Sequence, residues 1–161
     1  MKSPLAGGGS VKVFGKGTID DYMKMAKSNF SKGSGAVDDV VKGKMNMAGK
    51  VHPKSGIKFD LDGFPIFDSK HTMKLDKADF LKSRGTHFDR ASKDLYEKIL
   101  KNKEFASQFS LEEIEIFKSG GVPKRFTWHH HQDSGVMHLV DRKLHRQTGH
   151  IGGFSIWGPG N

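Results

Sequence analysis

Histidine is the residue type in this chain whose number and spacing suggest chemistry. The sequence contains nine histidines and no cysteine, and six of the histidines lie in the stretch 129–150. Neutral imidazole is a common ligand of zinc, nickel, manganese and similar ions. The lack of cysteine excludes thiolate metal sites, disulfides and cysteine nucleophiles. The clustered residues, which are His129, His130, His131, His138, His145 and His150, therefore predict a metal site, although three adjacent histidines can also bind metal adventitiously.

The expected secondary structure limits which histidines can share one ion. Neighbouring side chains on a strand point to opposite faces, so His129 and His130 cannot both be ordinary ligands, and one of them can instead act as a base beside the ion. His145 lies on a predicted helix, and a residue five positions later on an ideal helix is about 140° further round the axis. Gly149 can end this helix and let His150 turn back towards the ion.

A hairpin and a helix must position these histidines. β-branched and aromatic residues predict a strand over 124–131, residues 132–135 carry a turn signal, and 136–140 predict a second strand. Asp141 can cap a short helix that runs to about residue 147. His138, on the second predicted strand, competes for the third ligand position of the metal site.

Two longer helices are predicted before this hairpin. A capping-box pattern at Thr86 precedes an apolar helical face and predicts a helix over 87–102, and a second capping box at Ser110 predicts a helix over 110–119. Glycine and proline interrupt the short apolar pieces of 51–67, which predicts turns and short strands there.

The composition favours one folded domain with a basic leading segment. The chain has 161 residues, including twelve Phe and two Trp, and its formal net charge is +9. We expect residues 1–45 to be a Gly/Ser-rich, linker-like and partly flexible segment, and residues 46–161 to form the folded domain. A membrane-spanning protein is excluded because no run of eighteen apolar residues occurs. The basic charge suits nucleic acid, an anionic membrane or an acidic protein as partner.

Basic side chains flank the histidine cluster on both sides. They are Lys124, Arg125, Arg142, Lys143 and Arg146. Such a group is either a solvated face or a binding site for phosphates, and a metal site beside it favours phosphates. Because guanidinium groups can hold a phosphate in the transition state, we expect Arg125 to assist catalysis and the other four residues to contact nucleic acid.

The motifs of the C-terminal part resemble a known family. They are Phe126–His131, Gly135–Met137, Leu139–Val140, His145, His150–Gly153 and Trp157–Gly158. Together they resemble the colicin-type DNase/tRNase toxin domains, which belong to the Trp-His-His branch of the HNH, or ββα-metal, endonuclease superfamily. Similar domains form the C-terminal ends of bacterial polymorphic toxins, including those of the LXG type. The resemblance covers about 46–161 and implies an α+β fold, with a helical front part and a ββα-metal finger at about 124–153.

The resemblance also implies the roles of individual histidines. In this superfamily the first histidine of the pair is a metal ligand and the second is the general base, which assigns His129 and His130. Histidines on the following helix complete the ligand set, which matches His145 and His150. Related DNase toxins often carry an acidic residue where Thr127 stands, and their helical histidines are four residues apart instead of five.

These expectations combine into one predicted function. The chain is expected to be a metal-dependent endonuclease that hydrolyses phosphodiester bonds of DNA, delivered by a bacterium as an antibacterial toxin into the cytoplasm of a target cell. It would use one divalent ion (Zn, Ni, Mn or Mg) and be inhibited by an acidic immunity protein. Two alternatives stay open: a ribonuclease (tRNase-like) toxin on the same scaffold, and a non-catalytic nucleic-acid-binding module with a structural metal site.

Overall fold

The structure, a computed structural model, describes residues 47–159 of the chain. The chain divides into two compact units, of which one comprises Met1–Ile66 with Thr148–Ile151 and the other Phe67–Gln147 with Gly152–Asn161. The linker-like segment predicted for residues 1–45 lies outside the described residues. No helix in the described part is both long and apolar enough to cross a bilayer.

The described part of the first unit consists of turns and isolated bridges. The bridges are antiparallel and join Val51 to Lys58 and Phe59 to Pro65. The carboxylate of Asp60 accepts two backbone N–H bonds that close the turn before the second bridge. Thr148 Oγ1 donates a hydrogen bond of 2.6 Å to Ser55 Oγ and so ties the short segment 148–151 to this unit. The turns predicted for 51–67 are confirmed, whereas the short strands predicted there are present only as isolated bridges.

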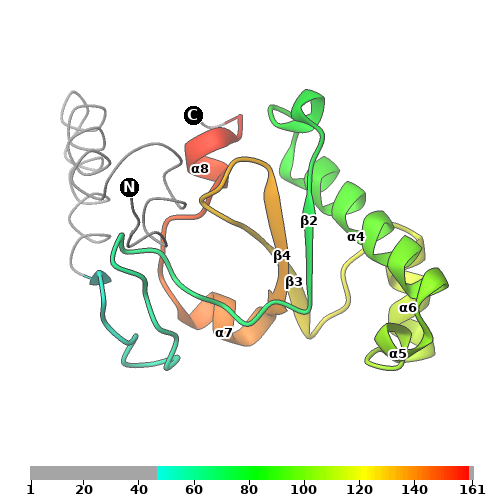
Figure 1. Ribbon diagram of the computed structural model, residues 1–161, viewed down its shortest axis with the longest axis horizontal. Coiled ribbons are helices and arrows are strands. Elements are labelled where there is room, and N and C mark those ends of the chain that lie inside the picture. The colour runs from blue at the N-terminus through cyan, green and yellow to red at the C-terminus, as the bar shows by residue number, and fades with distance from the viewer. Residues whose placement is uncertain (1–46, 160–161) are drawn as a thin grey trace, which may run out of the picture. The chain divides into compact units, whose positions relative to one another are not determined.

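The second unit contains a three-stranded antiparallel sheet. Its strands are β2 (His71–Lys74), β3 (Phe126–His130) and β4 (Val136–Asp141), in the order β2-β4-β3 (Figure 1). β3 and β4 form the predicted hairpin, in which His129 lies opposite His138. The edge strand β2 was not predicted, and it pairs with β4 from His71 opposite Leu139 to Lys74 opposite Val136.

Helices cover both faces of this sheet. The longer helices are α4 (Arg84–Lys101) and α6 (Leu111–Lys118), and the shorter ones are η1 (Lys77–Asp79), α5 (Lys103–Ala106), α7 (Arg142–Gln147) and α8 (Phe154–Trp157). α4 lies on one face of the sheet and α7 on the other (Figure 1). Leu95 of α4 and Phe117 of α6 share one apolar core with Trp128 and Leu139 of the sheet. The helices expected before the hairpin are confirmed apart from their ends.

The first turn of α4 differs from the prediction. The sequence contains two cap-type residues one turn apart, and the residue that caps the helix is Ser83 instead of Thr86. Ser83 Oγ accepts the backbone N–H of Thr86 at 3.1 Å, so the helix begins at Arg84. This earlier start places His87 inside the helix at a fully buried position. The capping box predicted at Ser110 is present.

A buried polar chain attaches β3 to α4. Trp128 Nε1 donates to Ser92 Oγ at 2.9 Å, and Ser92 Oγ donates to the backbone oxygen of Gly121 at 2.7 Å. Side chains alternate along a strand, so fixing Trp128 towards α4 sends His129 to the α7 face and His130 to the α4 face. The helices, the small antiparallel sheet and the order strand, strand, helix confirm the predicted α+β fold.

Candidate metal centre

Two histidine rings meet on the α7 face of the sheet. His129 comes from the end of β3 and His145 from α7, whose first turn is capped by Asp141 through a bond of 2.8 Å from the N–H of Leu144. His129 Nδ1 and His145 Nε2 lie 3.3 Å apart. Two nitrogens bound tetrahedrally to one ion at about 2.0–2.1 Å from it are about 3.3 Å apart. The pair therefore has the spacing of two ligands of a single ion.

An aromatic side chain shields this pair. The ring of Phe67 lies 5.0 Å from the ring of His129 and 5.2 Å from that of His145. His129 itself is only 2% exposed. An apolar wall of this kind limits the access of water and holds the imidazoles in one orientation. The packing around His129 and His145 therefore holds their ring nitrogens in place before an ion binds.

His150 has a proton arrangement that suits a metal ligand. His150 Nδ1 donates to the backbone oxygen of Thr148 at 2.6 Å, which leaves the lone pair of the neutral ring on Nε2. Burial also lowers the pKa of His150, which favours the neutral ring. Metal-binding histidines commonly donate their second nitrogen to a carbonyl in this way. Within residues 47–159, His129, His145 and His150 form a group that could hold a metal ion, each through one nitrogen.

His138, the other candidate for the third ligand, is not part of that group. Its ring packs 4.7 Å from the ring of His131, and burial lowers its pKa to about 4. His131 Nδ1 accepts the backbone N–H of Asp133 at 3.1 Å, so the neutral ring of His131 carries its proton on Nε2. The two side chains form a neighbouring histidine pair on the same face as His129, with ring centroids 6.4 and 6.3 Å from its ring.

His130 occupies a different environment from His129. It lies on the α4 face, is 3% exposed, and its Nε2 is 3.1 Å from Nδ1 of His87. Burial, followed by the neighbouring His87 and Arg84, lowers the pKa of His130 to about 3, so the ring is neutral at pH 7. Sequence reasoning missed His87. The signal was its spacing, because His87 precedes the buried residues Ala91 and Leu95 by four and eight positions.

Arg125 lies apart from the histidines. It directly precedes β3, four residues before His129, which corresponds to about 13 Å along a strand. Its Nε donates to Glu113 Oε2 at 2.6 Å, and its Nη2 donates to Glu113 Oε1 at 2.9 Å and to the backbone oxygen of Gln108 at 3.0 Å. This pairing holds the pKa of the Glu113 carboxyl below its usual value. The structure does not bring Arg125 to His130.

The four residues predicted to contact nucleic acid line one hollow of the second unit. The hollow has a volume of about 650 Å³, and its lining includes Lys124, Arg142, Lys143 and Arg146 together with Arg125. Lys124, Lys143 and Arg146 are exposed, whereas Arg142 is half-buried and donates weakly to the backbone oxygen of Pro123. The sequence-predicted basic cluster is thus continuous in space around the start of α7.

A known family matches most of the region that contains this arrangement. A family model for the DNase/tRNase domain of colicin-like bacteriocins matches residues 57–152, which is more than half of the chain. The matched region includes the hairpin, α7 and the six clustered histidines. Comparison with curated proteins gave no match. On this match, the chain belongs to the family of DNase/tRNase domains of colicin-like bacteriocins.

Proposed function

We propose that this domain is a metal-dependent endonuclease that hydrolyses phosphodiester bonds, with DNA as the favoured substrate, and that it acts within an antibacterial toxin. The observation that carries the proposal is the 3.3 Å separation of His129 Nδ1 and His145 Nε2, which suits two ligands of one ion. Membership of a nuclease family supplies the reaction class, and the histidine pair supplies the reason to expect an ion.

We assign His150 as the third ligand in preference to His138. The bond from His150 Nδ1 to a backbone carbonyl leaves Nε2 as the donor atom. His138 instead packs against a neighbouring imidazole. A Zn or Ni ion fits an all-imidazole donor set better than Mn or Mg, which prefer oxygen ligands.

The proposed reaction needs charge stabilisation and a proton acceptor. A bound ion supplies Lewis-acid stabilisation of the negative charge that develops on the phosphate. We assign proton removal from the attacking water to His130, which is neutral and has a lone pair at pH 7. A pKa of about 3 makes a weak acceptor. His131 is therefore the rival for this role, since it lies on the same face as His129.

Basic side chains would hold the substrate backbone. Lys124, Arg142, Lys143 and Arg146 line the hollow at the start of α7, where they can contact successive phosphates. Arg125 lines the same hollow, but its guanidinium is occupied by Glu113. We therefore assign Arg125 to shaping the phosphate-binding surface and not to the reacting phosphate.

Cleavage assays with two polymers test the proposal. Purified protein is incubated with plasmid DNA and with tRNA, with and without EDTA, and the fragment ends are labelled. We expect DNA cleavage that EDTA abolishes, with 5′-phosphate and 3′-hydroxyl ends. Faster cleavage of tRNA would favour the ribonuclease alternative, and 2′,3′-cyclic phosphate ends would indicate attack by the ribose hydroxyl. Metal binding without cleavage of either polymer would favour the alternative of a non-catalytic nucleic-acid-binding module with a structural metal site.

Variants separate the assigned histidines. His145→Ala should lose metal affinity and activity together, because it opens the ligand set. His130→Ala should bind metal normally and lose about 10²–10⁴-fold in rate, as expected for a general base. His52→Asn is the matched control, because His52 Nδ1 accepts backbone N–H bonds within its own turn and an Asn oxygen can do the same. Loss of activity in His131→Ala with retention in His130→Ala would reverse the assignment of the base.

The producing cell also needs protection from an unspecific nuclease. The net charge of +9 and the basic hollow would attract an acidic protein quickly, with an association rate that falls as salt is added. We therefore propose an acidic immunity protein as partner and an LXG-like polymorphic toxin as the parent protein. Co-expression of the neighbouring reading frame should relieve toxicity, and a harmless but folded domain without it would contradict the toxin proposal.

A further inference from the structure

His87 and His130 form a buried histidine pair on the α4 face of the sheet. His87 is 0% and His130 is 3% exposed. His87 Nδ1 lies 3.1 Å from His130 Nε2, and His87 Nε2 lies 2.7 Å from the backbone oxygen of Asp79. The rings of Phe154 and Trp157 pack against both imidazoles, with centroids 4.9–5.8 Å away. Neither imidazole can therefore turn without disturbing a packed aromatic neighbour.

These contacts determine where the protons of the pair lie. A backbone carbonyl only accepts hydrogen bonds, so His87 Nε2 must carry a proton and donate it to the oxygen of Asp79. In a neutral imidazole the other nitrogen then has a lone pair, so His87 Nδ1 accepts. The donor of the 3.1 Å contact is therefore His130 Nε2, which leaves the lone pair of His130 on Nδ1.

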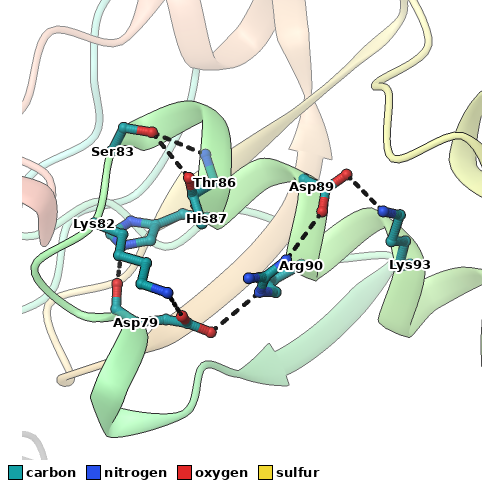
Figure 2. Close-up of polar contacts among 8 residues, drawn as sticks. All are labelled: Asp79, Lys82, Ser83, Thr86, His87, Asp89, Arg90 and Lys93. Carbon is teal, nitrogen blue, oxygen red and sulfur yellow. Dashed lines mark hydrogen bonds and ion pairs between the residues drawn. The ribbon is translucent and has the colours of Figure 1, made fainter.

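The surroundings of His87 hold its carbonyl partner in place. The carboxylate of Asp79 is 3.1 Å from Lys82 Nζ and 3.2 Å from Arg90 Nε, so two cations already occupy it (Figure 2). The backbone N–H of His87 is bonded to the oxygen of Ser83, the helix cap. The backbone oxygen of Asp79 is thus a fixed acceptor for Nε2 of His87.

We propose that His87 is a positioning residue of the nuclease site, which fixes His130 as the tautomer with its proton on Nε2 and its lone pair on Nδ1. The functional part of this inference rests on the proposed function, in which His130 accepts the proton of water. Nδ1 of His130 is then the atom that accepts the proton. The backbone oxygen of Asp79 holds the far end of the hydrogen-bonded chain that runs through His87 to His130. A base held in one tautomer and one orientation needs no reorganisation before it reacts.

Nitrogen NMR tests the tautomer independently of activity. The protein is labelled with ¹⁵N-histidine, and long-range proton–nitrogen spectra are recorded near pH 7.5, with His130→Gln and His87→Gln spectra used for assignment. We expect Nε2 of both residues to resonate as protonated nitrogens and Nδ1 of both as unprotonated ones. A protonated Nδ1 on His130 would overturn the proposal. A wild-type protein that cleaves neither polymer would defeat the proposed function but leave this spectroscopic result valid.

Two substitutions of His87 test its role in catalysis. His87→Gln can still donate to Asp79 and accept from His130, so it should keep most of the wild-type kcat. His87→Phe preserves a ring but supplies no acceptor, so kcat should fall by about 10–100-fold with little change in KM, as is typical when a supporting partner is removed. His71→Phe, which removes a buried histidine bonded to Asp94 instead, is the control for stability loss and should not change kcat. Equal kcat for the two His87 variants would refute the positioning role.

Discussion

Gly153 is a position where one added methyl group should separate α8 from the end of β3. Its backbone N–H donates to the oxygen of His130 at 2.7 Å, and Trp157 Nε1, four residues later, donates to the oxygen of His131 at 2.8 Å. Its φ and ψ of −58° and −25° are ordinary helical values. Alanine therefore meets no backbone strain at this position, and the effect of Gly153→Ala is purely steric.

The steric conflict can be calculated from the structure. A Cβ at Gly153 would lie 1.8 Å from the oxygen of His131 and 2.3 Å from Trp157 Nε1, whereas real Cβ contacts below 3.0 Å essentially do not occur. The backbones must therefore move apart by more than 1 Å. Two hydrogen bonds worth about 1 kcal/mol each are then weakened, and overpacking adds about 1–3 kcal/mol. Gly153→Ala should cost about 3–5 kcal/mol and lower the Tm by about 10 °C or more.

Thermal unfolding and metal titration measure this effect. Gly149→Ala is the matched control, because nothing lies within 4 Å of its added Cβ and its φ is not positive. That control should stay within about 0.5 kcal/mol of the wild type. Gly153→Ala should also bind metal more weakly, since the displaced strand end adjoins His129. Equal Tm values for the two variants would show that the close approach of Gly153 to β3 does not exist.

Three further outcomes follow from the site. The free energy of unfolding of chelator-treated protein should fall by about 2 kcal/mol between pH 7 and pH 5 because of His130. With a pKa of about 3 in the folded state and 6.5 in the unfolded state, this ring takes up its proton only on unfolding in that pH range. Urea titrations at the two pH values should show that His130→Gln removes this contribution. Arg125→Ala should raise KM more than it lowers kcat in steady-state cleavage assays, because Glu113 occupies its guanidinium. Calorimetric titration with Zn²⁺ should show at least a tenfold weaker affinity for His150→Ala, since one ligand is lost, and little change for His138→Ala.

The hairpin and its helix could be predicted because their signals are local. The turn before Gly135, the aromatic and β-branched residues on either side of it, and the cap Asp141 all lie within a few positions of the elements that they define. The same holds for the end of α7 at Gln147, which the following Gly149 signals and which allowed His150 to be considered as a ligand. A pattern confined to one short segment does not depend on the rest of the chain.

The edge strand β2 and the start of α4 could not be predicted in the same way. β2 has only four residues, and its pairing with β4 joins segments more than sixty positions apart in the sequence. Nothing in His71–Lys74 itself distinguishes it from a loop. At α4, Ser83 and Thr86 are both N-cap residue types one turn apart, and the structure selects Ser83, the better cap of the two. Tertiary context determined the edge strand.

The two adjacent histidines show how much chemistry depends on that context. Strand alternation predicts that His129 and His130 face opposite ways, but it does not say what each will meet. His129 meets α7, the helix that directly follows the hairpin, so its partner His145 is only sixteen residues away. His130 meets α4, so its partner His87 is forty-three residues away. The ββα finger therefore contains every proposed ligand, whereas the environment of the proposed base comes from a helix outside it. An isolated ββα finger that lacked α4 would keep the three proposed metal ligands. It would lose the contact between His87 and His130, which we propose determines the tautomer of His130.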